Sequence, residues 1–229
     1  MLLLQIERIK RATQIDRLIL ATSADPSDDP VEKLCLEHNI SCYRGSLNDV
    51  LDRFYQAAMP LHPDHVVRLT GDCPLADPLV IDQVISFHRQ GNFDYTSNVV
   101  EPSFPDGLDV EIFRFSCLEE AWKEAALPSQ REHVTPFIHL QPDRYKIGSV
   151  KNTVDLSKLR WTVDEPEDFE LATIIYEALY PVYPLFTMKD VLNYLDEKPE
   201  LKGYNTQFER NEGLKKSLVN DRTLPRKDG

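Results

Sequence analysis

Two aspartates stand where apolar, strand-like runs of the sequence end. Asp72 closes the run VVRLTGD (66–72), and Asp164 closes RWTVD (160–164), after which Pro166 opens a predicted helix. Ligands of open α/β sheets bind outside the carboxyl ends of the strands. Magnesium takes oxygen ligands, commonly one or two protein carboxylates completed by water and substrate phosphates. Asp72 and Asp164 are therefore candidate magnesium ligands and catalytic residues, although an aspartate after a strand is more often a turn former or a helix N-cap.

Charged residues inside predicted elements form a second group of candidates. Arg68 lies within a predicted buried strand, where an unpaired charge is costly, so it needs a carboxylate or phosphate partner. Arg53, in DVLDRF, reads from the sequence alone as a solvated helix arginine. Asp109 and Glu111 alternate with Leu108, Val110 and Ile112, and therefore share one strand face, which is most commonly an exposed one.

Composition limits the class of partner. The 229 residues carry a formal net charge of −12, with 38 acidic and 26 basic residues. This charge argues against nucleic acid and against an anionic membrane as the main partner. The four cysteines show neither zinc-site spacing nor the density of a disulfide scaffold. No apolar run is long enough to cross a membrane, and the N-terminal sequence lacks the features of a signal peptide, so we expect a cytoplasmic protein.

The first half of the chain alternates strand and helix patterns. This alternation predicts a mainly parallel sheet covered by helices on both faces, a three-layer α/β fold. Helical spacing of apolar residues also predicts that the chain opens in an amphipathic helix, and Asn48 is the predicted N-cap of the helix at 48–58. The predicted strands are 17–23, 41–45 and 64–72, and the predicted helices are 31–39, 48–58 and 78–90.

The second half has strands of mixed spacing, typical of an antiparallel excursion or an oligomer surface. We expect one α/β domain over residues 1–198 and a polar, partly ordered tail over 199–229. The predicted strands are 95–100, 109–115, 145–152 and 160–164, and the predicted helices are 116–126, 129–140, 166–180 and 187–197.

Several sequence blocks together resemble one family. RGSLNDVLDRFYQAA, VVRLTGDCPLADP, FPDGLDVEIF, REHVTPFIH and RWTVDEPEDFELA resemble, in that order, the cytidylyltransferases that activate sugar acids. The likeness is to the type of the spore coat polysaccharide biosynthesis protein F, related to the CMP-KDO and acylneuraminate cytidylyltransferases. The tail segment YNTQFERNEGLKKSL also resembles this subgroup. The resemblance implies a doubly wound, nucleotide-diphospho-sugar transferase-like fold and transfer of CMP from CTP to an acidic sugar for cell-surface polysaccharide.

The resemblance also implies roles for individual residues. It implies that Asp72 and Asp164 hold Mg²⁺, and that the protein forms a homodimer. Ala21 and Thr22 match the position of the nucleotide base, although packing is the plainer reason for such a strand end. Arg53 and Arg68 are expected near the nucleotide. Sugar recognition is implied for Asp109, Glu111, Arg131, Glu132 and His133; the last three otherwise read as a helix-surface charge cluster.

One departure from the family stands at the N-terminus. Family members begin with a strand and a glycine-rich loop that holds the triphosphate, whereas MLLLQIERIKRA resembles the helix that follows that loop. We therefore expect the first strand to be missing and the activity of the chain as written to be impaired. Two other functions stay open: a glycosyltransferase of similar fold, whose usual D-x-D pair is replaced here by GDCP, and a non-catalytic dimer partner or scaffold.

Overall fold

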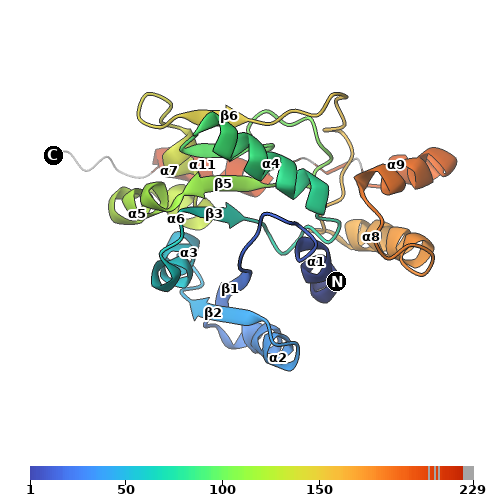
Figure 1. Ribbon diagram of the computed structural model, residues 1–229, viewed down its shortest axis with the longest axis horizontal. Coiled ribbons are helices and arrows are strands. Elements are labelled where there is room, and N and C mark those ends of the chain that lie inside the picture. Colours follow the sequence, from blue (N-terminus) through green and yellow to red (C-terminus); the bar gives the residue numbers. More distant parts are fainter. Residues whose placement is uncertain (206, 209, 211, 224–229) are drawn as a thin grey trace. The chain divides into compact units, whose positions relative to one another are not determined.

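The structure is a computed structural model that describes residues 1–205, 207, 208, 210 and 212–223, with only the backbone described at 222 and 223. The chain divides into two compact units. The first unit comprises Met1–Asp16, Val67–Ile112 and Gly148–Arg210, and the second comprises Arg17–Val66, Phe113–Ile147 and Asn211–Gly229. Figure 1 shows the helices and strands, most of them labelled as in the text below.

The second unit contains a parallel strand pair, as the alternation of strands and helices predicts. Strands β1 (Ile19–Ser23) and β2 (Ser41–Gly45) pair in register from Ile19 opposite Ser41 to Ser23 opposite Gly45. Helix α2 (Asp29–Glu37) connects them after the short helix η1 (Pro26–Asp28), and α3 (Val50–Ala58) follows β2. Helices α2 and α3 lie on opposite sides of the pair (Figure 1). This arrangement confirms a layered α/β architecture with parallel strands.

The predicted N-cap of α3 is wrong by one residue. Asp49, rather than Asn48, occupies the cap, and its side chain accepts a hydrogen bond of 2.9 Å from the backbone N–H of Asp52. Asparagine and aspartate are equally good caps, so the sequence pattern alone does not separate two such neighbours.

A four-stranded sheet has the order β3, β5, β4, β6. Its strands are shorter than the sequence predicts, because turn-forming residues such as Thr70, Gly71 and Asn98 follow the apolar runs. Helix α4 (Pro78–Gly91) packs against β4, and Asp77 caps it by accepting from the N–H groups of Leu79 and Val80 at 2.8 and 3.3 Å. The bounds are β3 His65–Arg68, β4 Tyr95–Ser97, β5 Glu111–Arg114 and β6 Ile147–Ser149, and the division into units falls within β3, β5 and β6.

The prediction of a strand at 160–164 is wrong. This segment forms only an isolated parallel bridge between Asp106 and Arg160. The N–H of Trp161 donates to the carbonyl of Asp106 at 2.6 Å, but the N–H of Val163 donates to the carbonyl of Asp72 at 2.8 Å. The segment is extended, as its alternating pattern indicates, yet it changes partner within two residues and so forms no regular ladder.

The prediction of one helix at 129–140 is also wrong, because this segment forms two helices, α6 (Pro128–His133) and α7 (Pro136–His139). Val134 has φ 70° and ψ −57°, outside the helical region. Pro136 has no N–H to continue a helix, and it stands instead at the first position of α7. The helix at 116–126 is observed as α5 (Phe115–Glu124).

The remaining helices match the expected positions closely. In the first unit, α1 (Leu2–Ile9) buries Ile6 and Ile9, and buried Arg8 donates to the carbonyls of Ala76 and Phe186, both at 2.9 Å. Among the residues described in the region predicted as a tail, two helices are found, α10 in the first unit and α11 in the second. The other bounds are η2 Met59–Leu61, α8 Pro166–Leu179, α9 Met188–Glu197, α10 Pro199–Lys202 and α11 Glu212–Thr223.

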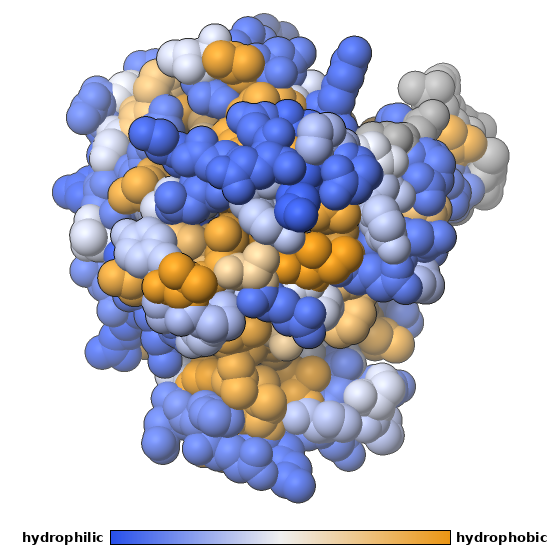
Figure 2. Space-filling model, turned by 90° about the vertical axis from the view of Figure 1, so that its right-hand side faces the viewer, coloured by the Kyte–Doolittle hydropathy of each residue, from blue (hydrophilic) through white to orange (hydrophobic). Residues whose placement is uncertain are grey.

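The surface mixes polar and apolar side chains. Figure 2 shows a face on which hydrophilic residues surround smaller hydrophobic areas. Exposed apolar residues of the first unit include Phe169, Val182, Tyr183 and Leu185. Scattered apolar exposure of this kind is ordinary for folded proteins. Among the described residues, no helix is both long and apolar enough to span a membrane.

Candidate functional site

The segments that carry Asp72 and Asp164 lie side by side in the first unit. The backbone carbonyl of Asp72 accepts from the N–H of Val163 at 2.8 Å and from Oγ1 of Thr162 at 3.3 Å. The carboxylate of Asp72 accepts a hydrogen bond from the hydroxyl of Thr70, and Sγ of Cys73 donates to the same oxygen at 3.3 Å. The turn after β3 is thus fixed against the extended segment that ends in Asp164.

Asp164 is oriented by an arginine that the sequence pattern did not single out. Its side chain is 50% exposed and accepts from a terminal nitrogen of Arg160 at 2.7 Å. Arg160 is buried, with 7% of its side chain exposed, and the same guanidinium nitrogen also donates to Asp168 at 2.7 Å. Its other terminal nitrogen lies 3.4 Å from Asp106. Arg160 therefore connects three carboxylates.

Asp168 is the buried anchor of this arrangement. Its side chain has no exposed surface, and it accepts from Nε of Arg160 at 3.0 Å and from the N–H groups of Asp164 and Glu165 at 3.1 and 3.0 Å. Nδ2 of Asn205 donates to it at 2.6 Å. Burial alone would raise the pKa of Asp168, but these hydrogen bonds, that from Arg160 foremost, outweigh it and lower the pKa. Asp168 is therefore held as a carboxylate.

Two more aspartates complete what we call the carboxylate cluster, formed by Asp72, Asp106, Asp109 and Asp164. Burial raises the pKa of Asp106, while the charges of Arg210 and Arg160 lower it and those of Asp164 and Asp72 raise it. Burial raises the pKa of Asp109 to about 7, against the lowering effect of Arg210 and with further increases from Asp106, Glu111 and Asp72. Each of these two carboxyl groups thus feels the negative charge of its neighbours.

Arg210 supplies positive charge to the buried half of the cluster. It donates to the carboxylate of Asp109 and, at 3.2 Å, to the carbonyl of Phe104. Its Nε lies 3.5 Å from a carboxylate oxygen of Asp106. Arg210 comes from the region predicted as a tail, but it belongs to the first unit.

The donor set fits a hard divalent cation. Asp72 is partly exposed and Asp164 half exposed, and both offer carboxylate oxygens, the ligands that Mg²⁺ prefers. Within the described part of the chain, no three His, Cys, Asp or Glu side chains converge as a metal site. A cation here would therefore take two protein carboxylates and complete its coordination from water and substrate oxygens.

The partner expected for Arg68 is Glu111. A terminal nitrogen of Arg68 donates to one oxygen of the Glu111 carboxylate, and the hydroxyl of Tyr95 donates to the other at 2.7 Å. The Glu111 side chain is 8% exposed. The predicted alternation places Asp109 and Glu111 near each other, but Glu111 already has both oxygens engaged by protein groups.

The other predicted residues belong to the second unit. Thr22 is the penultimate residue of β1. Its hydroxyl donates to Asp28 at 2.7 Å, and the N–H of Ser23 donates to the same oxygen at 2.9 Å. Hydrogen bonds from Ser23 and Thr22 lower the pKa of Asp28 to about 2. Ala21 precedes Thr22 in the same strand and is partly buried. The end of β1 is thus fixed around an ionised carboxylate.

One hydrogen-bond donor of Arg53 has no partner among the described residues. Its side chain passes close to Gly45, where an added Cβ would lie 2.8 Å from Cγ of Arg53. Burial lowers the pKa of Arg53, whereas the charges of Asp28 and Asp49 raise it. Its Nε is buried without a hydrogen-bond partner in the described structure. A buried guanidinium donor that lacks a partner fits the predicted role in anion binding.

Arg131, Glu132 and His133 are held by neighbouring helices. Arg131 donates through Nε to Asp49 at 3.0 Å and through a terminal nitrogen to the carbonyl of Trp122 at 2.8 Å. Ser217 of α11 donates to Glu132 at 2.8 Å and lies 3.1 Å from Nε2 of His133. These contacts are consistent with the structural alternative that the sequence left open, and they leave the predicted sugar-binding role untested.

Sequence reasoning missed several residues of the carboxylate cluster and its surroundings. A usable signal existed for Arg160, since an arginine in an extended apolar segment needs an anionic partner, as argued for Arg68. Asp106 lies within the quoted block FPDGLDVEIF and Asn205 within YNTQFER, but neither spacing points to the cluster. The missed residues are Asp106, Arg160, Asp168, Asn205 and Arg210.

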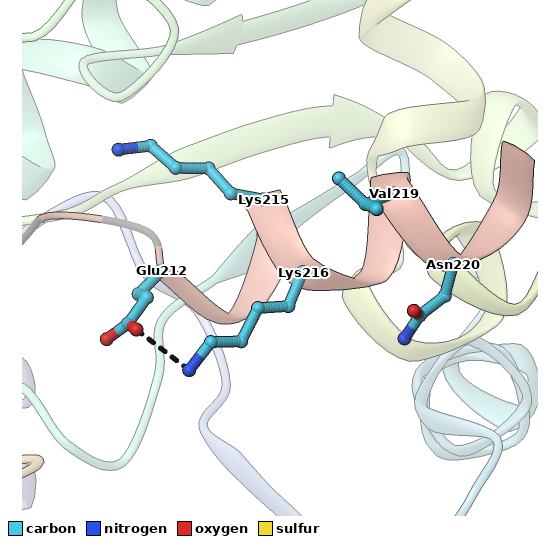
Figure 3. Close-up of a pocket in the computed structure, with 5 residues that line it drawn as sticks. All are labelled: Glu212, Lys215, Lys216, Val219 and Asn220. Atoms are coloured by element: carbon cyan, nitrogen blue, oxygen red, sulfur yellow. Dashed lines mark ion pairs between the residues drawn. The ribbon is translucent and has the colours of Figure 1, made fainter.

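A shallow pocket of about 280 Å³ lies along α11 in the second unit (Figure 3). Its lining comes from one helix only, and an ion pair of 2.8 Å joins Glu212 to Lys216 across one turn. The lining residues are Glu212, Lys215, Lys216, Val219 and Asn220. None of the predicted site residues lines this pocket.

Comparison with known proteins identifies clear relatives. A family model described as cytidylyltransferase matches residues 1–201. An uncharacterized protein of Methanocaldococcus jannaschii is 35% identical over 207 residues, which cover 88% of this chain and 82% of that protein. The spore coat polysaccharide biosynthesis protein SpsF of Bacillus subtilis (strain 168) is 32% identical over 188 residues, 81% of this chain and 77% of that protein.

Solved structures show the same fold. The structure of a cytidylyltransferase from Leptospira borgpetersenii aligns with a TM-score of 0.83 and 29% identity, and covers 91% of this chain and 87% of that chain. A CMP:2-keto-3-deoxy-manno-octonic acid synthetase complexed with CTP aligns with a TM-score of 0.56 and 12% identity, over 78% of this chain and 88% of that chain. The second likeness is one of fold alone.

Proposed function

The chain belongs to the cytidylyltransferase family, and we propose that it transfers CMP from CTP to an acidic sugar, with Mg²⁺ as cofactor. Membership of this family supports nucleotidyl transfer as the type of reaction. The acidic sugar is supported by the sequence resemblance, and the link to a polysaccharide by SpsF, a relative named for spore coat polysaccharide biosynthesis. The product would be a CMP-activated sugar for a cell-surface polysaccharide.

One observation supports the assignment of the chemistry to Asp72 and Asp164. The 2.8 Å hydrogen bond from the N–H of Val163 to the carbonyl of Asp72 joins the segments that carry both carboxylates. Two carboxylates at neighbouring segment ends are the protein ligands that a magnesium ion in a phosphate-handling site requires. The cluster is otherwise rich in negative charge, which a bound cation would offset.

The proposed reaction is a displacement at the α-phosphorus of CTP. A hydroxyl oxygen of the sugar bonds to that phosphorus and releases its proton to water, while the bond to the bridging oxygen of the β-phosphate breaks. Pyrophosphate leaves with the electron pair of that bond. Such reactions depend mainly on positioning and on stabilisation of developing charge.

Asp72 and Asp164 would hold Mg²⁺, which supplies Lewis-acid neutralisation of phosphate charge and a template for the two substrates. Hydrogen bonds within the chain orient both carboxylates. Thr70 and Cys73 fix the Asp72 carboxylate, and Arg160 fixes that of Asp164. Both side chains are thereby oriented by hydrogen bonds before a metal binds.

Nucleotide and sugar contacts are proposed for the remaining residues. Arg53 offers an unpaired buried donor for an anion, and Thr22 lies near the end of β1, where the resemblance places the base. Among the residues with a proposed sugar role, Asp109 is a buried carboxyl group whose pKa burial raises to about 7. Ala21, Arg68, Glu111, Arg131, Glu132 and His133 keep the nucleotide or sugar roles that the resemblance implies.

Two further properties stay predictions from the sequence: a homodimer and a cytoplasmic location. The expected impairment of turnover also stays a prediction. Size-exclusion chromatography with light scattering tests the homodimer.

A product assay tests the proposed reaction. The chain is incubated with Mg²⁺, each of the four ribonucleoside triphosphates and a panel of acidic sugars, and CMP-sugar and pyrophosphate are measured. We expect both products with CTP only. Asp72→Asn and Asp164→Asn should lower the rate at least about 100-fold, because each removes a charged ligand oxygen. The matched control is Asp16→Asn, which changes an exposed aspartate of the same unit.

Two outcomes would contradict the proposal. Product formation that survives both ligand substitutions would remove Asp72 and Asp164 from the chemistry. Sugar transfer from a nucleotide-sugar, with no reaction of CTP, would favour the glycosyltransferase alternative.

A further inference from the structure

Asn205 lies in the region that the sequence predicts to be a tail, yet it is one of the most buried polar residues of the first unit. Only 1% of its surface is exposed. Its Nδ2 donates to Oδ1 of Asp168 at 2.6 Å and to the carbonyl of Arg160 at 3.0 Å. A buried amide with two good hydrogen bonds has a fixed orientation.

The contacts of Asn205 lead to Asp164 in two steps. Asp168 accepts two hydrogen bonds from Nε of Arg160, at 3.0 and 3.2 Å, and one from a terminal nitrogen at 2.7 Å. That terminal nitrogen also donates to Asp164 at 2.7 Å. The aromatic ring of Phe208 lies beside the same guanidinium, with its centroid 5.6 Å from Cζ. Asn205 and Phe208 together restrict how Arg160 can reach Asp164.

The cost of losing this contact follows from burial. The Asp168 side chain has no exposed surface, so an oxygen that loses Asn205 cannot be hydrated without rearrangement. Arg160 is the other side-chain donor to Asp168, so it must compensate for the lost hydrogen bond by moving toward Asp168. Any such movement changes the hydrogen bond that orients Asp164.

We propose that Asn205 is a positioning residue, which sets the orientation of the Asp164 carboxylate for a divalent cation through Asp168 and Arg160. This inference rests on the proposed function, which makes Asp164 a metal ligand. Residues that orient metal ligands typically change metal affinity or activity 10–100-fold when they are altered. Asn205 thus belongs to the metal-binding machinery, although it touches no substrate.

A metal-binding measurement tests the inference without relying on turnover. Mn²⁺ is titrated into the full chain in the presence of CTP, and free Mn²⁺ is followed by electron paramagnetic resonance. We expect Asn205→Ala to raise the Mn²⁺ dissociation constant about 10-fold. We expect a larger increase for Asn205→Asp, which is nearly isosteric but places a second carboxylate against Asp168 and draws Arg160 away from Asp164. The matched control is Asn193→Ala, an exposed asparagine on α9 of the same unit.

The outcomes separate this inference from the proposed function. If Asp164→Asn weakens Mn²⁺ binding while folded Asn205→Ala and Asn205→Asp bind like the parent, the inference is overturned and the ligand assignment stands. If Asp164→Asn itself binds Mn²⁺ normally, the proposed ligand is wrong. If Asn205→Ala fails to fold, Asn205→Asp alone decides, because it preserves the size of the side chain.

Discussion

The ionisation of Asp109 connects burial to a measurable property of the protein. Burial raises its pKa from 3.8 to about 7, although Arg210 opposes the change. Between these two values the folded chain binds a proton that the unfolded chain does not. The contribution of Asp109 to stability is therefore most favourable at low pH and declines as the pH rises through about 7.

We predict that the substitution Asp109→Asn removes this part of the pH dependence. Stability of the parent relative to the variant should fall between pH 4.5 and 8, by up to about 1.4 kcal/mol per pH unit where the proton difference is complete. Urea unfolding of both proteins across this pH range measures the difference in their free energies of unfolding. A stability difference that stays constant with pH would show that Asp109 is not buried as described.

Residues of the candidate site differ in how far the sequence predicts them. Asp72 and Asp164 follow recognisable apolar runs, and Arg68 stands out as a charge within one. Asn205 has no comparable signal, because its partner Asp168 is 37 residues away in the chain. Local spacing predicts which side chains end an element, but not which distant backbone or carboxylate they meet.

At the scale of elements, the turn at Gly107 holds the two segments next to Asp106 and Arg160 together. Gly107 has φ 99°, and an added Cβ would lie 2.5 Å from both the backbone nitrogen of Thr162 and the carbonyl carbon of Trp161. Backbone atoms cannot move aside as a side-chain tip can. The close approach of the two segments therefore requires glycine.

We predict that Gly107→Ala destabilises the protein. The positive φ alone costs about 1–3 kcal/mol, and the contacts with backbone add to it. Gly71→Ala is the control, because an added Cβ there meets no atom within 4 Å. Thermal unfolding should give a midpoint several degrees lower for Gly107→Ala and little change for Gly71→Ala. Equal midpoints for the two variants would contradict the described turn.

The sequence predicts helices correctly where their local periodicity and capping residues determine the structure. Amphipathic periodicity and prolines at the first turn located α4 and α8 to within a residue or two. The pattern failed at 160–164, whose alternation indicates extended chain but not that its partner changes from Asp106 to Asp72. It also failed at 129–140, where Val134 leaves the helical region. In both cases long-range packing or local backbone strain overrides the periodic signal.

At the scale of the whole molecule, the predicted site residues are divided between the two compact units of the chain. The predicted residues Asp72, Asp164, Arg68, Asp109 and Glu111 belong to the first unit, and Ala21, Thr22, Arg53, Arg131, Glu132 and His133 to the second. The first unit continues to Arg210, past the predicted domain end at 198. CTP is the ligand whose binding tests the proposed reaction most directly.

The most direct measurement is the thermal midpoint of the 229-residue chain with CTP and Mg²⁺, beside ATP, GTP and UTP. A ligand at about 100 times its dissociation constant adds roughly 2.7 kcal/mol, and each kcal/mol raises the midpoint by about 2–4 °C in a domain of this size. We predict an increase that is selective for CTP, depends on Mg²⁺ and is lost in Asp72→Ala. An equal response to all four nucleotides, or none, would contradict the proposed function and favour a scaffold; a CTP response retained in Asp72→Ala would contradict the metal site.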